Sequence, residues 1–487
     1  MDNNNVKTAG SQGLKKQLNP MSVWALAFGC VIGWGSFINP GKKFLPNSGV
    51  AGTAIAMVLG ALVMVIIAFS YAYLIPKYPK AGGEFTFTRE CYGKVPAYIC
   101  GWFLAAAYLT NVPMNSTAIP LIINGIFGEK ALDWGFSYEI AGSTVTLGGI
   151  LIAAFILILF GVLNILGVKK AGFVQTILAS MLAICAFTLF ISCLISAKSS
   201  GVNLAPVWGF DKSALQEALK AGGGYTESMA NQNWAAAILA TFAIAPWAFV
   251  GFDTIPQASE EFKFSYKKVI FIMVIAIAFG CFVYVSNNTV AAAALANWPE
   301  RCANGEWVLL VAAEELLGVL PAKILIGVGV SCAVLSGIMG FYLASSRLMY
   351  SMSRQGYLPP VFGKIDEKHG TPKNAMIFCV IVSLAGPILG REALGWFVDM
   401  SAIGASIGYL FTSLATIHVI KRDKDGGNWL KVMGILGVIL SASFIVLQLV
   451  PIPGLKGVSF GWQSYVMLGV WVAIGTVFYF MQRRKMQ

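Results

Sequence analysis

The sequence predicts an all-α polytopic membrane protein with about twelve transmembrane helices, and three observations support this class. Of its 487 residues, 57% are hydrophobic and only 11% are charged, whereas soluble domains carry about 25% charged residues. The apolar residues form successive runs of about 20 residues, the length needed to cross a bilayer. The basic residues concentrate in alternate connections between these runs, as they do in multi-pass proteins.

The predicted spans follow a polar N-terminal tail at residues 1–19. No small-residue cleavage site follows the first apolar run, so we expect an uncleaved first helix and not a signal peptide. The twelve spans are predicted near residues 20–46, 49–76, 95–124, 143–166, 170–196, 234–259, 268–298, 321–352, 374–391, 393–420, 431–450 and 462–482.

The net charge of +12 orients the chain and needs no nucleic-acid partner. With the N-terminus inside, basic residues crowd the connections at 77–94, 263–268, 364–373 and 421–431, and far fewer fall in the alternate connections. This asymmetry predicts that both termini are cytoplasmic in a multi-pass protein of the cell membrane. The nine cysteines show no metal-binding or disulfide spacing and are interpreted as small buried hydrophobes.

The first run contains a weak stretch, GCVIGWGSFINP at residues 29–40, with Gly29, Gly33, Gly35 and Pro40. Each glycine costs a helix about 1 kcal/mol relative to alanine. Backbone that leaves the helix at membrane depth is tolerated only around a polar cavity. We therefore expect an unwound segment whose amides bind a carboxylate and whose carbonyls bind an ammonium group.

The sixth run has a matching interruption, with Pro246, Gly251 and Pro256 around an ionisable Asp253. Two interruptions five helices apart are typical of inverted-repeat transporters. The predicted organisation is a cytoplasmic tail at 1–19, a first repeat of five helices at 20–196, an extracellular loop at 197–233, a second repeat at 234–420, and two further helices with a tail at 421–487.

Three motifs carry a resemblance to a known family. They are the pattern Gly29, Gly33, Gly35 and Phe37, the loop KYPKAGGEFTFTRECYGK at 77–94, and the segment SRLMYSMSRQGYLPPVFGKIDEKHGTP at 346–372. In this order and spacing the chain resembles the amino acid–polyamine–organocation superfamily of secondary transporters. The resemblance implies a five-plus-five inverted repeat with discontinuous first and sixth helices, and alternating-access transport of an amino acid or small amine.

The resemblance also implies the substrate contacts. Amides around Trp34, Gly35 and Ser36 would bind the carboxylate, and carbonyls near Val31, Ile32, Ala245 and Trp247 would bind the amine, with Trp247 as an aromatic gate. Gly33 and Gly35 would let the ligand approach the backbone closely, and Gly251 is a further candidate contact. The bulky Trp34 departs from many relatives and would narrow or cover the pocket. Phe249 and Phe341 are further candidate contacts, as are Asn111 and Asn115, which could instead bond between helices.

The coupling ion is left open between sodium, proton and exchange, and no cofactor is expected. Several proton-coupled relatives carry a lysine where this chain has Leu182, and its absence argues against that fixed-lysine proton mechanism and leaves exchange or sodium coupling. Ser331 and Ser336 could supply oxygens to sodium, or could bond to their own backbone. Asp253 and Asp399 are candidate gating or proton-transfer groups. The alternatives are that Asp253 caps exposed amides and that Asp399 joins helices.

Two further expectations concern the connections. Arg89, Arg347, Arg354, Glu84 and Glu90 either pair when an inner gate closes or are solvated, orienting charges. Residues 304–318 are predicted to form a short external helix.

Other classes of protein are less well supported. The main alternative is a ligand-binding receptor or sensor of transporter fold, for which we find no long signalling domain. A channel, an enzyme and an ATP-driven pump lack a repeated pore loop, a catalytic cluster and a phosphate-binding loop, respectively. The identity of the amino acid or amine and the choice between monomer and homo-oligomer are left open.

Overall fold

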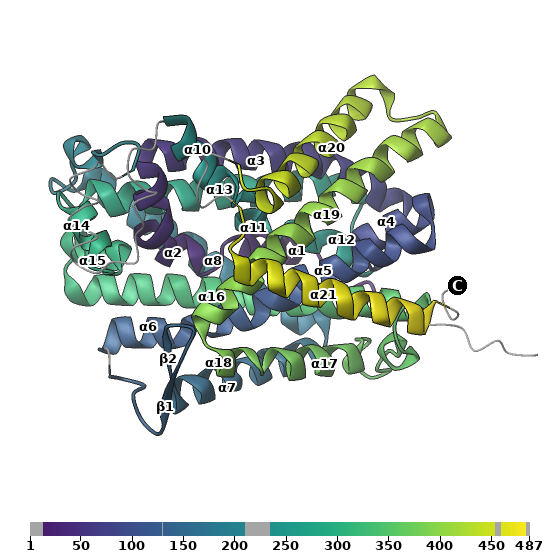
Figure 1. Ribbon diagram of the computed structural model, residues 1–487, viewed down its shortest axis with the longest axis horizontal. Coiled ribbons are helices and arrows are strands. Elements are labelled where there is room, and N and C mark those ends of the chain that lie inside the picture. The colour runs from purple at the N-terminus through teal and green to yellow at the C-terminus, as the bar shows by residue number, and fades with distance from the viewer. Residues whose placement is uncertain (1–12, 129, 210–233, 453–458, 484–487) are drawn as a thin grey trace, which may run out of the picture.

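The computed structural model describes residues 13–128, 130–209, 234–452 and 459–483, and these form an almost entirely helical bundle (Figure 1). The strands of the described ranges are β1 (Ser137–Ile140) and β2 (Ser143–Thr146), which pair antiparallel with Ser137 opposite Thr146.

The first part of the chain builds the helices that precede residue 210. They are α1 (Pro20–Val31), α2 (Gly35–Asn39), a π-helical turn η1 (Pro40–Phe44), α3 (Leu45–Lys77), α4 (Gly83–Tyr92), α5 (Lys94–Ser116), α6 (Ala118–Phe127), α7 (Leu147–Ile165), α8 (Val168–Ile195) and a 3₁₀ turn η2 (Gly201–Leu204).

The second part builds the helices that follow residue 233. They are α10 (Trp234–Phe242), α11 (Ala245–Phe249), α12 (Thr254–Gln257), η4 (Ser259–Glu261), η5 (Tyr266–Lys268), α13 (Val269–Ala293), α14 (Trp298–Ala303), α15 (Val308–Leu317), α16 (Val319–Arg354), η6 (Pro360–Gly363), α17 (Lys373–Ser383), α18 (Gly386–Leu389), α19 (Arg391–Asp423), α20 (Gly427–Leu449) and α21 (Trp462–Gln482).

The predicted multi-pass architecture is confirmed. Nine helices of the described ranges are long and apolar enough to cross a membrane. The remaining predicted spans are the first and the sixth, which are interrupted, and the ninth, which is a shorter apolar helix over Lys373–Leu389. The outermost helices expose apolar side chains, as helices that face lipid do: Ile184 on α8 is 64% exposed and Val477 on α21 is 62% exposed.

Local signals explain where several helices begin and where the first two spans separate. Asn19 caps α1 by accepting the Ser22 N–H at 2.8 Å, and Pro20 occupies the first turn, where a missing N–H has no cost. Thr146 caps α7 in the same way through Gly149. Gly49 has φ +63 inside α3, which turns the chain at the predicted boundary between the first and second spans.

Three connections can be compared with the predictions from the sequence. The fourth span was predicted from residue 143, but 143–146 form β2 and the helix begins at Leu147. The loop at 77–94 contains helix α4. The external helix predicted at 304–318 is confirmed as α15. Most of the predicted extracellular loop, at 210–233, lies outside the described residues.

Helix α1 lies at the centre of the bundle, packed against α8, α13 and α16 (Figure 1). Two ends of the bundle are used below: the α4 end, where α3 finishes and α4 lies, and the α15 end, where α14 and α15 lie. The core between them is nearly continuous and includes Phe28, Val31, Phe249 and Tyr284.

Candidate functional site

The first interruption leaves backbone amides uncovered in the middle of the bundle. The Ile32 N–H still donates to Phe28 O at 3.0 Å, and then the chain leaves the helix until α2 begins at Gly35. Among the described residues, the N–H groups of Gly33, Trp34 and Gly35 have no hydrogen-bond partner. Gly33 is partly exposed although its neighbours are buried.

The Ser36 amide is less available than predicted. It donates to Gly33 O at 3.3 Å, and the Ser36 hydroxyl donates to the same oxygen at 3.0 Å. The Ser36 carbonyl accepts Asn287 Nδ2 at 2.9 Å, which fastens α2 to α13. Ser36 therefore stabilises the turn beside the uncovered amides.

The second interruption lies between α11, which ends at Phe249, and α12, which begins at Thr254. Asp253 Oδ1 accepts the Gly251 N–H at 2.7 Å, and Thr254 Oγ1 donates to Gly251 O at 2.6 Å. Asp253 thus caps a buried amide that lies in the break between α11 and α12, which corresponds to one of its two predicted roles.

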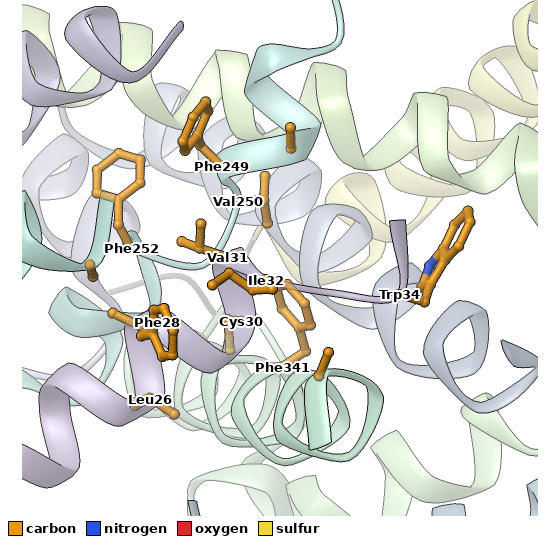
Figure 2. Packing of buried hydrophobic residues seen from close by; sticks show 14 of the residues in the cluster. Leu26, Phe28, Cys30, Val31, Ile32, Trp34, Phe249, Val250, Phe252 and Phe341 are labelled. Atoms are coloured by element: carbon orange, nitrogen blue, oxygen red, sulfur yellow. The ribbon is translucent and has the colours of Figure 1, made fainter. Parts of the chain in front are cut away.

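The two interruptions touch through their backbones. Gly251 has φ +140, and a Cβ placed on it would lie 2.5 Å from Val31 N. A side chain cannot be accommodated at that distance. In Figure 2 the chain beside Val250 approaches Val31 and Ile32, so predicted contacts from both interruptions surround one place.

Two tryptophans and an arginine cover one side of this place. Trp247 packs on Gly35, where an added Cβ would lie 2.6 Å from the indole. The Trp34 and Trp247 ring centroids are 5.8 Å apart, and the Arg391 guanidinium lies 3.8 Å from the Trp34 ring centroid. Trp34 points away from Ile32 (Figure 2). The Trp34 indole therefore belongs to a group of side chains that covers one side of the two interruptions, and a cation–π contact with Arg391 holds it in place.

Asn115 on α5 supplies a polar group to the site. Its Nδ2 donates to Asn111 O at 2.8 Å, but its Oδ1 is buried without a hydrogen-bond partner. This oxygen would lie 3.6 Å from a Cβ placed on Gly33, and Gly337 on α16 leaves room for the amide. An unsatisfied buried acceptor beside a partly exposed glycine is suited to bind an ammonium group.

The other predicted contacts lie at varying distances from the uncovered amides. Phe341 on α16 lies beside Ile32 in Figure 2. Asn111 bonds to Ser401 on α19 at 2.6 Å and so joins two helices. Phe249 faces Gly60 of α3 and Tyr284 of α13. Ala245 is fully buried, and a Cβ on Gly60 would meet its methyl group.

The predicted cation ligands do not converge. Ser336 Oγ lies 3.0 Å from both Gly29 O and Ala333 O, either of which can accept its one hydrogen. Ser331 is five residues away on a different helix face. Leu182 is fully buried in the apolar core.

Gln175 on α8 was missed by the sequence reasoning. Its Nε2 donates to Ala25 O at 3.0 Å and would lie 2.5 Å from a Cβ on Gly29. The signal was a glutamine within the otherwise apolar fifth run.

A buried polar network at the α4 end was also missed. Glu84, proposed as a gate or solvated charge, is fully buried and accepts Tyr71 at 2.7 Å and Gln257 at 2.6 Å. Arg347 is equally buried and pairs with Glu261 at 2.8 Å. The available signal was an acid at the start of α4 and two acids after the sixth run.

Asp399 on α19 accepts the Ser464 hydroxyl of α21 at 2.5 Å. It therefore joins two helices, which was the alternative to a gating role.

A multi-pass bundle with two interrupted spans whose bared peptide groups meet at a small, partly exposed site has the architecture of a membrane transporter. Residues 18–474 match a family profile described as amino acid permease. The chain belongs to this amino acid permease family.

Individual relatives are distant but extend over most of the chain. It is 25% identical to the branched-chain amino acid permease BcaP of Bacillus subtilis (strain 168), over 98% of this chain and 95% of that protein. It is 24% identical to the methylthioribose transporter of the same bacterium, again over 98% and 95%. It is 27% identical to the large neutral amino acids transporter small subunit 2 of Homo sapiens, over 77% of this chain but only 64% of that protein.

Proposed function

We propose that this permease is a secondary active transporter that moves a neutral amino acid or related small amine by alternating access. The observation that carries the proposal is the meeting of two interrupted spans at Gly251 and Val31, beside amides with no partner in the described part of the chain. Such backbone is stable at membrane depth only if it lines a cavity or a binding site.

The proposed contacts place the two charges of an amino acid at opposite sides of Gly33. The amides of Gly33, Trp34 and Gly35 bind the carboxylate, and Asn115 Oδ1 binds the ammonium group together with the Ile32 carbonyl. Trp247 and Phe341 border the remaining space. Since these two side chains are aromatic, a substrate with a small or apolar side chain fits best.

The coupling ion is proposed to be a proton, or else the transporter exchanges substrates. A sodium ion needs several oxygen ligands, but beside Gly29 and Ser336 the chain presents the donor Nε2 of Gln175. A flipped Gln175 amide would place two acceptor oxygens against each other at Ala25, so the donor assignment is the one the contacts favour.

The proposed orientation follows from the charge pattern and places both termini in the cytoplasm. The proposed location is the cell membrane. The α4 end is then the cytoplasmic end and the α15 end faces outward. The alternative is a receptor that binds its ligand without transporting it. Uptake measurements distinguish this receptor from a transporter.

The test is uptake into proteoliposomes of a panel of neutral, basic and acidic amino acids, with Asn115→Ala as the diagnostic variant. We expect uptake of neutral amino acids, and KM raised at least tenfold in Asn115→Ala because the ammonium group loses an acceptor. The matched control is Asn164→Ala on α7, whose amide bonds to Phe160 O at 3.0 Å and contacts Met339 of α16, and its KM should change less than twofold. An unchanged KM in Asn115→Ala would contradict the placement, and no uptake of any substrate would contradict transport.

A further inference from the structure

Two carboxylates that are far apart in the sequence share one phenol inside the protein. Glu84 lies on α4, Asp253 lies in the second interruption, and both are fully buried. The Tyr108 hydroxyl of α5 lies 3.1 Å from Asp253 Oδ2 and 3.4 Å from Glu84 Oε1. Among the described residues, neither carboxylate forms a salt bridge.

The Tyr108 hydroxyl also lies 3.2 Å from the Asp253 carbonyl, and Glu84 Oε1 already accepts the Tyr71 hydroxyl at 2.7 Å, so these contacts accommodate Glu84 both with and without a proton. A phenol has one O–H to donate, so it can satisfy only one of the two carboxylates that it approaches. If Glu84 Oε1 carries a proton, the Glu84 O–H donates to Tyr108 Oη and the Tyr108 O–H donates to Asp253 Oδ2. Asp253 then stays ionised, consistent with the Gly251 N–H that its other oxygen accepts at 2.7 Å.

In the part of the chain that the structure describes, the hydrogen-bond donors to Glu84 carry no positive charge. Tyr71 and Gln257 donate to Glu84, but both are neutral. Arg347 on α16 is engaged by Glu261. The titratable groups that influence the two carboxylates from neighbouring helices are neutral thiols and phenols: Cys30 on α1, Tyr71 on α3, Cys100 and Tyr108 on α5, and Tyr409 on α19.

Two further atoms in this network lack partners. Gln257 Oε1 and the Tyr409 hydroxyl are buried without hydrogen bonds, although Gln257 Nε2 donates to Glu84 Oε2 at 2.6 Å. Burial, and then the negative charge of Asp253, raise the pKa of Glu84, which lies outside the membrane-spanning helices. Two carboxylates that share one phenol in an enclosed site oppose each other's ionisation, so loss of the proton is unfavourable there.

We propose that Glu84 and Asp253 together form a proton-binding site, and that the proton they share is the coupling ion. This inference rests on the proposed transport function. With the proton bound, α4 is held to α5 and α12 through Tyr108 and Gln257. When the proton leaves the Glu84 oxygen for water at the α4 end, two anions face each other across Tyr108 and repel.

Repulsion at this position reaches the substrate site directly. Asp253 is two residues from Gly251, whose backbone touches Val31, and α4 covers the α4 end of the bundle. Loss of the proton therefore favours separation of α4 from the second interruption, which opens that end. Substrate binding and proton release are thereby linked through the segment from Gly251 to Asp253.

The first experiment measures uptake into proteoliposomes with and without an inward proton gradient. We expect the gradient to raise wild-type accumulation several-fold, and the stimulation to fall as pH rises and Glu84 loses its proton. Glu84→Gln, which cannot release a proton, should lose at least nine-tenths of this stimulation. The control on the same helix is Glu90→Gln, whose carboxylate lies 3.6 Å from Lys80 at the surface, and it should behave as wild type. Full stimulation in Glu84→Gln would overturn the proposal.

The second experiment does not need transport. Infrared difference spectra of the purified protein, recorded across a pH titration, should show a carboxylic acid band that is absent in Glu84→Gln and present in Glu90→Gln. In Tyr108→Phe, which keeps the ring and removes the bridge, the titration midpoint of this band should move by at least about one pH unit. A band that persists in Glu84→Gln, or a midpoint unmoved in Tyr108→Phe, would overturn the shared proton.

The two experiments separate failure of this inference from failure of the proposed function. Wild-type protein that transports amino acids with no response to a proton gradient would overturn the coupling and leave the transport function standing. Wild-type protein that transports nothing would contradict the transport function and, with it, the coupling role, while the infrared titration would still decide whether Glu84 carries the proton.

Discussion

At Gly251 the absence of a side chain allows the two interruptions to touch. The residue combines φ +140 with a backbone neighbour, Val31 N, 2.5 Å from where a Cβ would lie. Gly251→Ala should therefore lower stability by about 1–3 kcal/mol from strain alone, and the overlap should push the interruptions apart and reduce transport at least tenfold.

Thermal unfolding of the purified protein and uptake assays check this prediction. Gly305→Ala is the matched control, since Gly305 has φ +72 with nothing within 4 Å of an added Cβ. That variant should lose about 1 kcal/mol and keep its transport rate. If the two variants had equal stability and equal transport rates, the close approach at Gly251 would have no role in transport.

The short helix η4 is bonded to two distant parts of the chain. Its Glu261 binds the buried Arg347 of α16, and the Glu261 carbonyl accepts the N–H groups of Gln17 and Leu18 at 2.9 Å. Arg347→Met should destabilise the protein by about 3–5 kcal/mol because Glu261 is left as an uncompensated buried charge. The double variant Arg347→Met/Glu261→Gln should regain much of the loss.

The measurement is thermal unfolding in detergent. Arg422→Ala is the control, because Arg422 pairs with Asp423 while its own side chain is 48% exposed, and exposed pairs contribute at most about 1 kcal/mol. If Arg347→Met were as stable as Arg422→Ala, the pair would not hold η4 to α16.

The elements also show what sequence patterns can and cannot predict here. Gly33, Gly35 and Pro246 predicted both interruptions because breakers in apolar runs act locally. The strand at 143–146 was missed because four β-branched and polar residues merge into the adjoining apolar run. The burial of Glu84 and the contact of Gln175 with α1 depend on partners from distant helices, so no local pattern reveals them.

For the molecule as a whole, the charge asymmetry predicts which end faces the cytoplasm. Lys170 and Lys198 are both exposed and flank opposite ends of α8. In intact cells, a membrane-impermeant maleimide should label Lys198→Cys but label Lys170→Cys only after permeabilisation. Unsubstituted protein is the control, since its cysteines in the described ranges are buried or half-buried. Labelling in the reverse order would invert the proposed orientation.

The contact between Gly251 and Val31 bears on how relatives with such different names share one fold. The contact joins a glycine to main-chain atoms of Val31 and Cys30, so it does not depend on a particular side chain at Val31. Substitution of Asn115, Trp247 or Phe341 would leave this main-chain contact in place. Two relatives are named for branched-chain amino acids and for methylthioribose, and each is only 24–25% identical to this chain. A main-chain contact would tolerate side-chain differences on this scale.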